Sequence, residues 1–175
     1  GTNKTQPIKY FEKRGSAQCK SAVMLAALNT RGETIIKAKK SRNHSELIFK
    51  YLNLNIKTKK TKHFDLIKIK GGKKIKTFDY KIPSDISSGS FFIVLTALKN
   101  NSKLTIKNIN INHSRIGLII ILKKMGIKIY FKNKKIYKGE QIADIVIISP
   151  KFIKAINCPK KLNSGAIDEF LVIFL

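Results

Sequence analysis

An internal repeat is the feature that most limits how this chain can fold. Residues 22–28 (AVMLAAL) align with residues 92–98 (FIVLTAL), and both are apolar runs of the kind found in buried helices. In each copy the run is followed by a strand pattern, an amphipathic helix pattern and further strand patterns. A third copy begins at residue 165 and is cut off. A repeat of this length exceeds a solenoid unit, so it predicts similar subdomains with helices inside and sheets outside.

The same patterns predict the individual elements. In the first copy we expect helices at 16–28 and, after a cap at Ser41 or Asn43, around residues 47–52. Strands in this copy are expected at 7–11, 33–37, 55–59, 64–70 and, after a Gly71-Gly72 turn, 74–80. The second copy is expected to hold helices at 88–98 and 114–124 and strands at 103–108, 128–131 and 144–148.

The formal charge of +26 predicts attraction of anionic ligands. Lysines supply most of this charge, and they are spread along the whole chain rather than clustered with Arg and aromatic residues, as in a nucleic-acid surface. Lys, Ile and Asn are encoded by AT-rich codons, which accounts for part of the bias. A Lys-rich nucleic-acid-binding protein is therefore the alternative function rather than the first one.

Several classes of protein do not fit the sequence. The cysteines, Cys19 and Cys158, lie far apart, and no histidine pair has metal-ligand spacing, so we expect no metal site. No apolar run approaches the ~18 residues of a membrane span, and the start shows no signal-peptide pattern. We therefore expect a cytoplasmic protein, and both ends of the chain look cut, as in a fragment.

Polar residues precede apolar bodies at several predicted helix starts, including residues 16–18 and the pair Ser41-Arg42. Backbone N–H groups in the first turn of a helix attract anions, and an Arg beside a Ser adds charged phosphate donors. Asp168 also heads an apolar run, a position suited to a general base. Each of these positions also has a simpler explanation as a helix cap, and the sequence leaves both interpretations open.

Seven motifs come in a fixed order along the chain. They are Ser16-Ala17-Gln18-x-Lys20-Ser21-Ala22, residues 41–46 (SRNHSE), residues 83–92 (PSDISSxxFF), Asn112-x-x-Arg115-x-Gly117, Met125-Gly126, residues 139–144 (GExIAD) and residues 167–170 (IDEF). In this series the chain resembles the 5-enolpyruvylshikimate-3-phosphate synthase family. It is most similar to the glyphosate-insensitive bacterial class, in which SAQxKSA, SRDHTE and IDEFP are typical.

The resemblance implies an α/β fold, an inverse α/β barrel built of repeated βαβαββ units, of which parts of two domains are present. Residues 1–80 match the last unit of the N-terminal domain, and residues 81–85 match the crossing between domains. Residues 86–164 match the first unit of the C-terminal domain, and residues 165–175 match the truncated start of the next unit.

The resemblance also implies an enzyme, 3-phosphoshikimate 1-carboxyvinyltransferase, of the shikimate pathway to chorismate and the aromatic amino acids. Family members transfer the enolpyruvyl group of phosphoenolpyruvate to the 5-hydroxyl of shikimate 3-phosphate, without metal or cofactor, and we expect a monomer when full length. The positions that match shikimate-phosphate contacts are Ser16, Ala17, Gln18, Ser41, Arg42 and Asp168. Asp168 also matches the proposed proton acceptor.

Some of the family's pattern is absent from this chain. Ser84 stands where Gly is usual, Gln141 where Pro is usual, and Leu171 where Pro is expected after Phe170. The family's phosphoenolpyruvate-binding Arg loop and several other basic motifs lie outside the sequence. We therefore expect a fragment with half of a shikimate-phosphate site, which does not turn over alone.

Overall fold

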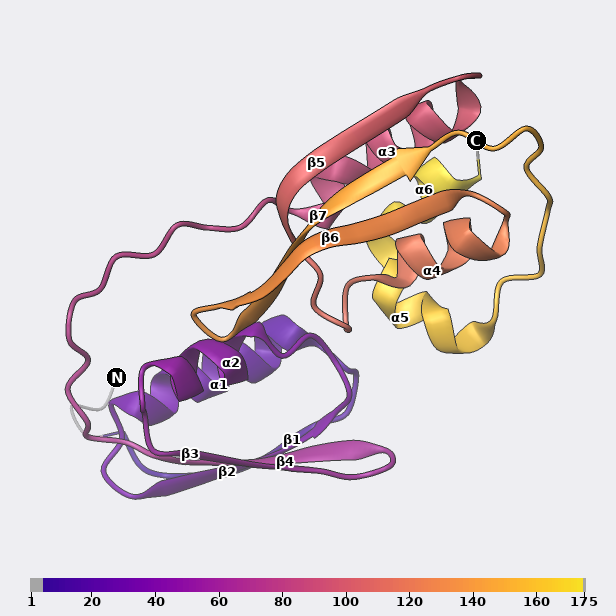
Figure 1. Cartoon of the computed structure of the whole chain (residues 1–175). Helices are drawn as coiled ribbons and strands as arrows, with labels where there is room; N and C mark the ends of the chain where they lie inside the picture. The colour runs from indigo at the N-terminus through magenta and orange to yellow at the C-terminus, as the bar shows by residue number, and fades with distance from the viewer. Residues whose placement is uncertain (1–4, 175) are drawn as a thin grey trace. The chain divides into compact units, whose positions relative to one another are not determined.

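The computed structural model describes residues 5–174 and divides the chain into two compact units, Gly1–Asp79 and Tyr80–Leu175 (Figure 1). Each unit has its own sheet and its own apolar core. In both, the helices pack on one face of the sheet (Figure 1). No helix within residues 5–174 has the length and apolar character needed to cross a membrane.

The first unit has the order βαβαββ. Its elements are β1 (Lys9–Glu12), α1 (Ala17–Leu28), β2 (Glu33–Lys39), α2 (His44–Tyr51), β3 (Ile56–Lys60) and β4 (Phe64–Lys70). The strands are ordered β1-β2-β4-β3, with β1 parallel to β2 and the other pairs antiparallel. Met24 of α1 and Phe49 of α2 pack on Ile36, Ile67 and Ile69 of the sheet. Each such buried apolar side chain contributes about 1.5–3 kcal/mol to the free energy of unfolding.

The second unit repeats this arrangement. Its elements are α3 (Ile86–Leu98), β5 (Lys103–Asn110), α4 (Gly117–Lys124), β6 (Lys128–Tyr137) and β7 (Glu140–Ile148), and the strand order is β5-β7-β6. The place of β1 is taken by Ser84, which forms a single parallel bridge with Ile109 of β5 just before α3 begins. The repeat predicted from the two apolar runs is therefore confirmed, with its first strand reduced to one bridge.

The chain ends in short helical turns rather than in one buried helix. They are η1 (Lys160–Leu162), α5 (Asn163–Ala166), η2 (Ile167–Glu169) and α6 (Phe170–Ile173). Asp168 precedes the predicted apolar run, but it lies within the short turn η2 rather than at the start of a regular helix. Ala166 and Val172, which flank this turn, are buried and anchor it.

The strand expected at 74–80 is also absent. Residues 71–83 form no regular element, and the side chains of Ile75 and Phe78 are largely exposed. A strand that followed β4 through the Gly71-Gly72 turn would need a free edge, but β4 is already paired with β2 on one side and with β3 on the other. The segment therefore cannot form a hairpin with β4, although its sequence alternates.

The apolar helices are covered on one side only in this chain, which corrects the expectation that they are buried all round. Leu25 of α1 is 56% exposed, and α3 exposes Phe91, Phe92 and Leu95 by more than half. Each helix packs on the sheet of its own unit, and α3 also contacts η2 and α6.

Candidate functional site

Two of the predicted phosphate-contact segments lie at one edge of the first unit's sheet. β1 and β2 are parallel, with Glu12 opposite Ala38, so their carboxyl ends meet at the same edge. Residues 16–18 follow the end of β1, and Ser41 follows the end of β2. Gly15 (φ +80°) brings the two loops into contact, because a Cβ at this position would lie 3.5 Å from the Lys40 carbonyl oxygen.

The loop that leads into α1 is held by a buried carboxylate. Glu12 is only 3% exposed, and its oxygens accept the backbone N–H groups of Arg14 at 2.8 Å and Gly15 at 2.6 Å. Burial raises the pKa of Glu12, but hydrogen bonds from the N–H groups of Arg14, Ser16 and Gly15 outweigh it and hold this pKa below its usual range. Glu12 therefore stays charged and fixes the entry to the helix.

Ser16 caps α1, as one of the two interpretations of the sequence predicted. Its Oγ accepts the Cys19 N–H at 3.2 Å and donates to Gln18 Oε1 at 3.4 Å, which is the long limit of a hydrogen bond. The N–H groups of Ala17 and Gln18 have no intrahelical acceptor because they belong to the first turn. This turn can therefore still receive an anion while Ser16 acts as the cap.

Ser41 does not cap α2. The N-cap residue is Asn43, which forms no side-chain cap bond. The Ser41 hydroxyl is buried and forms no hydrogen bond within residues 5–174. The capping explanation therefore fails for Ser41, and its buried hydroxyl without a partner carries an energetic cost. Arg42 follows it in the same loop and is half-buried.

A buried lysine ties this loop to α1. Lys20 is 1% exposed, and its Nζ lies 2.7 Å from the Arg42 carbonyl oxygen and 2.7 Å from Oε1 of Glu46 on α2. Sequence reasoning missed this residue as part of the site. The available signal was a single charged residue in an otherwise apolar helix.

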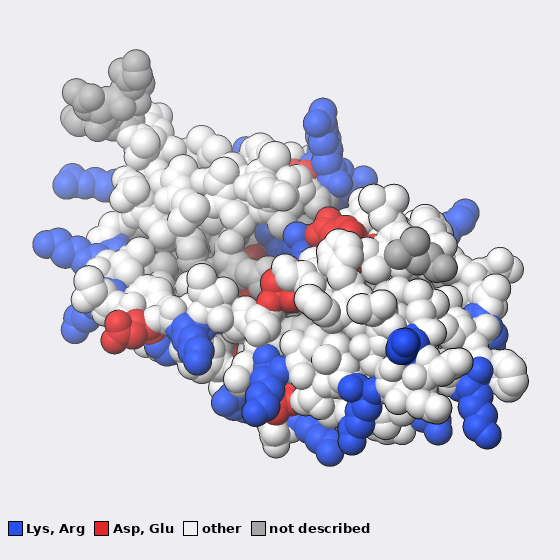
Figure 2. Space-filling view, turned by 90° about the horizontal axis from the view of Figure 1, so that it is seen from above, with Lys and Arg blue, Asp and Glu red and all other residues white. Residues whose placement is uncertain are grey.

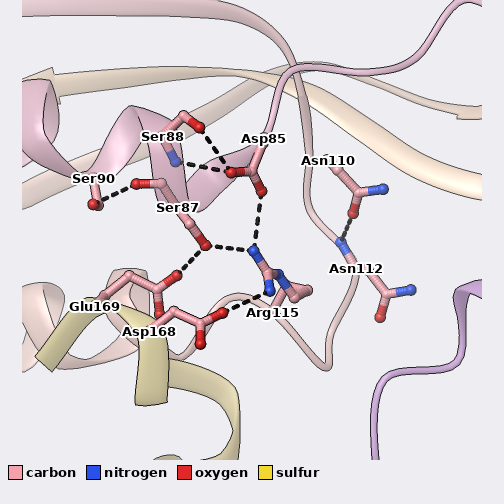
Figure 3. Close-up of polar contacts among 9 residues, drawn as sticks. All are labelled: Asp85, Ser87, Ser88, Ser90, Asn110, Asn112, Arg115, Asp168 and Glu169. Carbon is pink, nitrogen blue, oxygen red and sulfur yellow. Dashed lines mark hydrogen bonds and ion pairs between the residues drawn. The ribbon is translucent and has the colours of Figure 1, made fainter. Parts of the chain in front are cut away.

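Asp168, the remaining predicted site residue, belongs to the second unit, where Arg115 holds it (Figure 3). Arg115 Nη1 donates to Asp168 Oδ2 at 3.1 Å, and Nη2 donates to Asp85 Oδ1 at 3.0 Å and to Ser87 Oγ. The Arg115 side chain is 11% exposed, whereas that of Asp168 is 45% exposed. The Asp168 carboxylate is therefore oriented by a buried cation and accessible from solvent at the same time.

Glu169, the neighbour of Asp168, is the buried carboxylate of this turn. It is 2% exposed, and its Oε1 accepts the Ser87 hydroxyl at 2.5 Å. In Figure 3 the carboxylates of Asp168 and Glu169 both face the cluster formed by Ser87 and Arg115. Both carboxylates therefore bind this cluster, but Glu169 is buried whereas Asp168 remains partly accessible to solvent.

Asp85 is the cap of α3 and the second anion of this cluster. Its Oδ2 accepts the backbone N–H of Ser88 at 2.9 Å and the Ser88 hydroxyl at 3.0 Å. Burial raises the pKa of Asp85, but these hydrogen bonds, that of the Ser87 N–H and the charge of Arg115 hold it below its usual range. The capping interpretation is therefore correct for this helix start.

The motif around Arg115 explains how this side chain is aimed. Asn112 Oδ1 accepts the Ser114 N–H at 2.9 Å, and the Asn112 carbonyl accepts the Arg115 N–H at 2.8 Å, which closes a tight turn. Gly117 begins α4 against the backbone of Gly165, where a Cβ would lie 2.4 Å from the Gly165 carbonyl carbon. In the motif Asn-x-x-Arg-x-Gly, Asn112 thus closes the turn and Arg115 places its guanidinium. Gly117 leaves room for the segment that carries Asp168.

Asp144, in the motif at residues 139–144, has a structural role. Its oxygens accept the Asn108 N–H at 2.9 Å and the Asn133 side-chain amide at 2.7 Å. Both asparagines have positive φ and lie at irregularities in β5 and β6. The same two hydrogen bonds hold the pKa of Asp144 below its usual range. This carboxylate therefore stabilises two bulges rather than binding a ligand.

The basic side chains form no single patch on the face seen in Figure 2, where they are scattered among uncharged residues. Within residues 5–174 no cluster of three or more His, Cys, Asp or Glu side chains could hold a metal ion. The candidate sites are therefore the two polar clusters, one around Ser16 and Ser41 and the other around Arg115.

Comparisons with known proteins agree with these features. A sequence profile of the family described as EPSP synthase (3-phosphoshikimate 1-carboxyvinyltransferase) matches residues 1–167. The chain is 42% identical over 96% of its length to 3-phosphoshikimate 1-carboxyvinyltransferase of Ruthia magnifica, and 37% identical over 99% to that of Petrotoga mobilis. It spans 38% and 39% of these two relatives.

The fold agrees as well. The structure matches an EPSP synthase from Acinetobacter baumannii with a TM-score of 0.86 and 34% identity, over 98% of this chain and 38% of that one. At this coverage the match extends through both units. On sequence and on fold, the chain belongs to the EPSP synthase family.

Proposed function

We propose that this chain supplies part of the shikimate 3-phosphate site, and the proton-accepting carboxylate, of an enzyme that transfers an enolpyruvyl group. In the reaction the enol carbon of phosphoenolpyruvate is protonated and the 5-hydroxyl oxygen of shikimate 3-phosphate adds to the adjacent carbon. The hydroxyl loses its proton as the bond forms. The resulting tetrahedral intermediate then loses phosphate together with a proton from the new methyl group, which restores the carbon–carbon double bond. Such chemistry needs positioned substrates and stabilised charge rather than a covalent bond to the enzyme.

We assign the chain to the middle of such an enzyme. Residues 1–80 form the last βαβαββ unit of an N-terminal domain, and residues 81–85 form the crossing to a C-terminal domain. Residues 86–164 form the first unit of that second domain, and residues 165–175 begin the next. The shared strand order of the two units and the Ser84 bridge support this assignment.

The observation that carries the proposal is the common sheet edge of the first unit. Ser16, Ala17 and Gln18 at the start of α1, and Ser41 and Arg42 after β2, form the phosphate and ring contacts. The loops touch at Gly15, and the buried Ser41 hydroxyl has no partner among the described residues. The first turn of α1, two hydroxyls and a guanidinium together suit a phosphate monoester.

Asp168 acts as the base in this proposal. Its carboxylate is oriented by Arg115, which leaves it accessible to a substrate hydroxyl. A carboxylate that already accepts a charged hydrogen bond on Oδ2 still has lone pairs for the hydroxyls of the shikimate ring. We propose that the full-length enzyme is cytoplasmic and monomeric, which cell fractionation and sedimentation test.

Titration of the chain with shikimate 3-phosphate, followed by ¹H–¹⁵N NMR, tests the proposal. We expect amide shifts at residues 16–18 and 41–42, weaker or no shifts with shikimate, and survival of the signal in the presence of mixed-sequence DNA. Shifts caused only by DNA would favour the nucleic-acid alternative. No response to shikimate 3-phosphate at millimolar concentration would contradict the proposed site.

A further inference from the structure

Lys20 is the most deeply buried cation in the site of the first unit. It lies one turn after the cap of α1, and its backbone N–H donates to the Ser16 carbonyl at 3.2 Å. Its side chain is 1% exposed, and that of its partner Glu46 is 7% exposed. A lysine so buried is costly unless it is paired, so its position needs an explanation beyond packing.

The ammonium makes two different contacts. One is the ion pair with Glu46 at 2.7 Å, and the other is the hydrogen bond to the Arg42 carbonyl at 2.7 Å. The ion pair joins α1 to α2, a task that the Ser21–Ser45 hydroxyl pair at 2.6 Å also performs. The bond to the carbonyl fixes the loop that carries the unpartnered Ser41 hydroxyl.

We propose that Lys20 is a positioning residue that holds the Ser41–Arg42 loop against the start of α1, so that both segments contact one phosphate. This inference rests on the proposed function. In it Lys20 does not touch the substrate, because its ammonium is enclosed by the Arg42 carbonyl and Glu46. Glu46 serves as the counter-ion that permits the buried charge.

The two tasks can be separated by substitution. Ser21→Ala/Ser45→Ala removes the other link between α1 and α2 and leaves both contacts of the ammonium intact. Lys20→Met/Glu46→Met removes the bond to the carbonyl without leaving an unpaired charge, and such apolar replacements of a buried pair are usually tolerated. Lys20→Met/Glu46→Gln is a second version in case the first does not fold. Lys50→Met on α2 is the matched control, since it removes a surface lysine from the same unit.

The experiment measures two quantities in the full chain: amide hydrogen exchange of residues 41–43, and affinity for shikimate 3-phosphate by NMR titration. In the double variant we expect exchange at 41–43 to rise about tenfold or more while exchange within α1 is unchanged. Affinity should fall about tenfold or more. Ser21→Ala/Ser45→Ala and Lys50→Met should stay within about threefold of the original chain in both quantities.

The outcomes separate this inference from the proposed function. If the original chain fails to bind shikimate 3-phosphate, the proposed site is contradicted, while exchange at 41–43 still decides whether Lys20 holds the loop. If the double variant keeps the original affinity, the inference is overturned, whether or not the loop exchanges faster. An equal loss of affinity in Ser21→Ala/Ser45→Ala would also overturn it, because the joining of α1 to α2 rather than the bond to the carbonyl would then matter.

Discussion

Arg115 and Asp168, 53 residues apart in the chain, form an ion pair with Nη1 and Oδ2 separated by 3.1 Å. The same guanidinium binds Asp85 at the cap of α3, so the turn that carries Asp168 is docked to the start of a helix. The position of Asp168 therefore depends on a residue that need not contact a substrate.

Arg115→Met is expected to lower turnover more than it weakens substrate binding. The assay uses a hybrid in which this chain is joined to the remaining segments of the Acinetobacter baumannii enzyme. We expect kcat to fall at least about tenfold with a smaller rise in KM for shikimate 3-phosphate, because a misplaced base affects mainly the transition state. The free energy of unfolding should fall by about 1–3 kcal/mol, since the pair is only partly buried.

Arg115→Lys is the control for this prediction. A lysine keeps the charge but cannot contact Asp85 and Asp168 through a planar fork, so we expect partial recovery of stability and little recovery of kcat. Equal effects on kcat and on stability in both variants would mean that Arg115 has a structural role alone.

Asp168→Asn should keep the shape of the turn and remove the base. In the same hybrid we expect turnover to fall on the order of 10²–10⁴-fold, as for other general bases, with a much smaller change in shikimate-phosphate affinity. Asp79→Asn, in the irregular segment after β4, makes the same charge change and should have no effect on turnover. Near-normal turnover in Asp168→Asn would contradict the catalytic assignment.

Gly117→Ala should detach the segment that carries Asp168. The new Cβ would lie 2.4 Å from the Gly165 carbonyl carbon, and a backbone cannot move aside as a side chain can. We expect a loss of about 1–3 kcal/mol in the free energy of unfolding. Gly89→Ala in α3 is the matched control, because its Cβ would meet only the Ile109 and Ile106 methyl ends at 3.3 and 3.4 Å. That variant should be neutral or slightly stabilising.

Glu12 should titrate below its ordinary pKa of 4.5. The amide proton of Gly15, which Glu12 accepts, should therefore shift with a midpoint below pH 4.5 in an NMR titration. Because the folded state holds this proton more weakly than the unfolded chain, the stabilisation by Glu12 is fully present above about pH 4.5. It is lost as the pH falls through the folded-state pKa.

Glu12→Gln is the variant that isolates this effect. At pH 7 the free energy of unfolding of the original chain should be larger than that of Glu12→Gln. This difference should shrink as the pH falls below 4.5. A difference that grows on acidification would show that the charged form of Glu12 is not the stabilising one.

The architecture could be predicted from the sequence because apolar runs and turn residues are local signals. The runs at 22–28 and 92–98 predicted α1 and α3, and Phe64–Lys70 was predicted with its observed bounds. The false strand at 74–80 shows the limit of such signals, since alternation cannot reveal that β4 has no free edge.

The site was harder to predict from the sequence because its contacts join residues far apart in the chain. Capping and ligand binding require the same residue types at a helix start, so only the structure distinguishes Ser16, which caps, from Ser41, which does not. The sequence does not show that Lys20 pairs with Glu46, and this pairing is what allows the lysine to be buried. The role of Arg115 likewise depends on contacts with two carboxylates that are distant in the chain, Asp85 and Asp168.

The dissociation constant of shikimate 3-phosphate for Arg42→Ala, compared with the original chain, tests the central claim most directly. In the proposed site Arg42 supplies the charged donor that the neutral hydroxyls of Ser16 and Ser41 lack, and a charged hydrogen bond is worth about 1.5–3 kcal/mol. Arg42→Ala should therefore weaken binding about tenfold or more. Arg31→Ala, which removes the same charge from the turn before β2, should leave the constant unchanged. Equal constants for Arg42→Ala and the original chain, or equal losses in both variants, would contradict a phosphate site at this edge of the sheet.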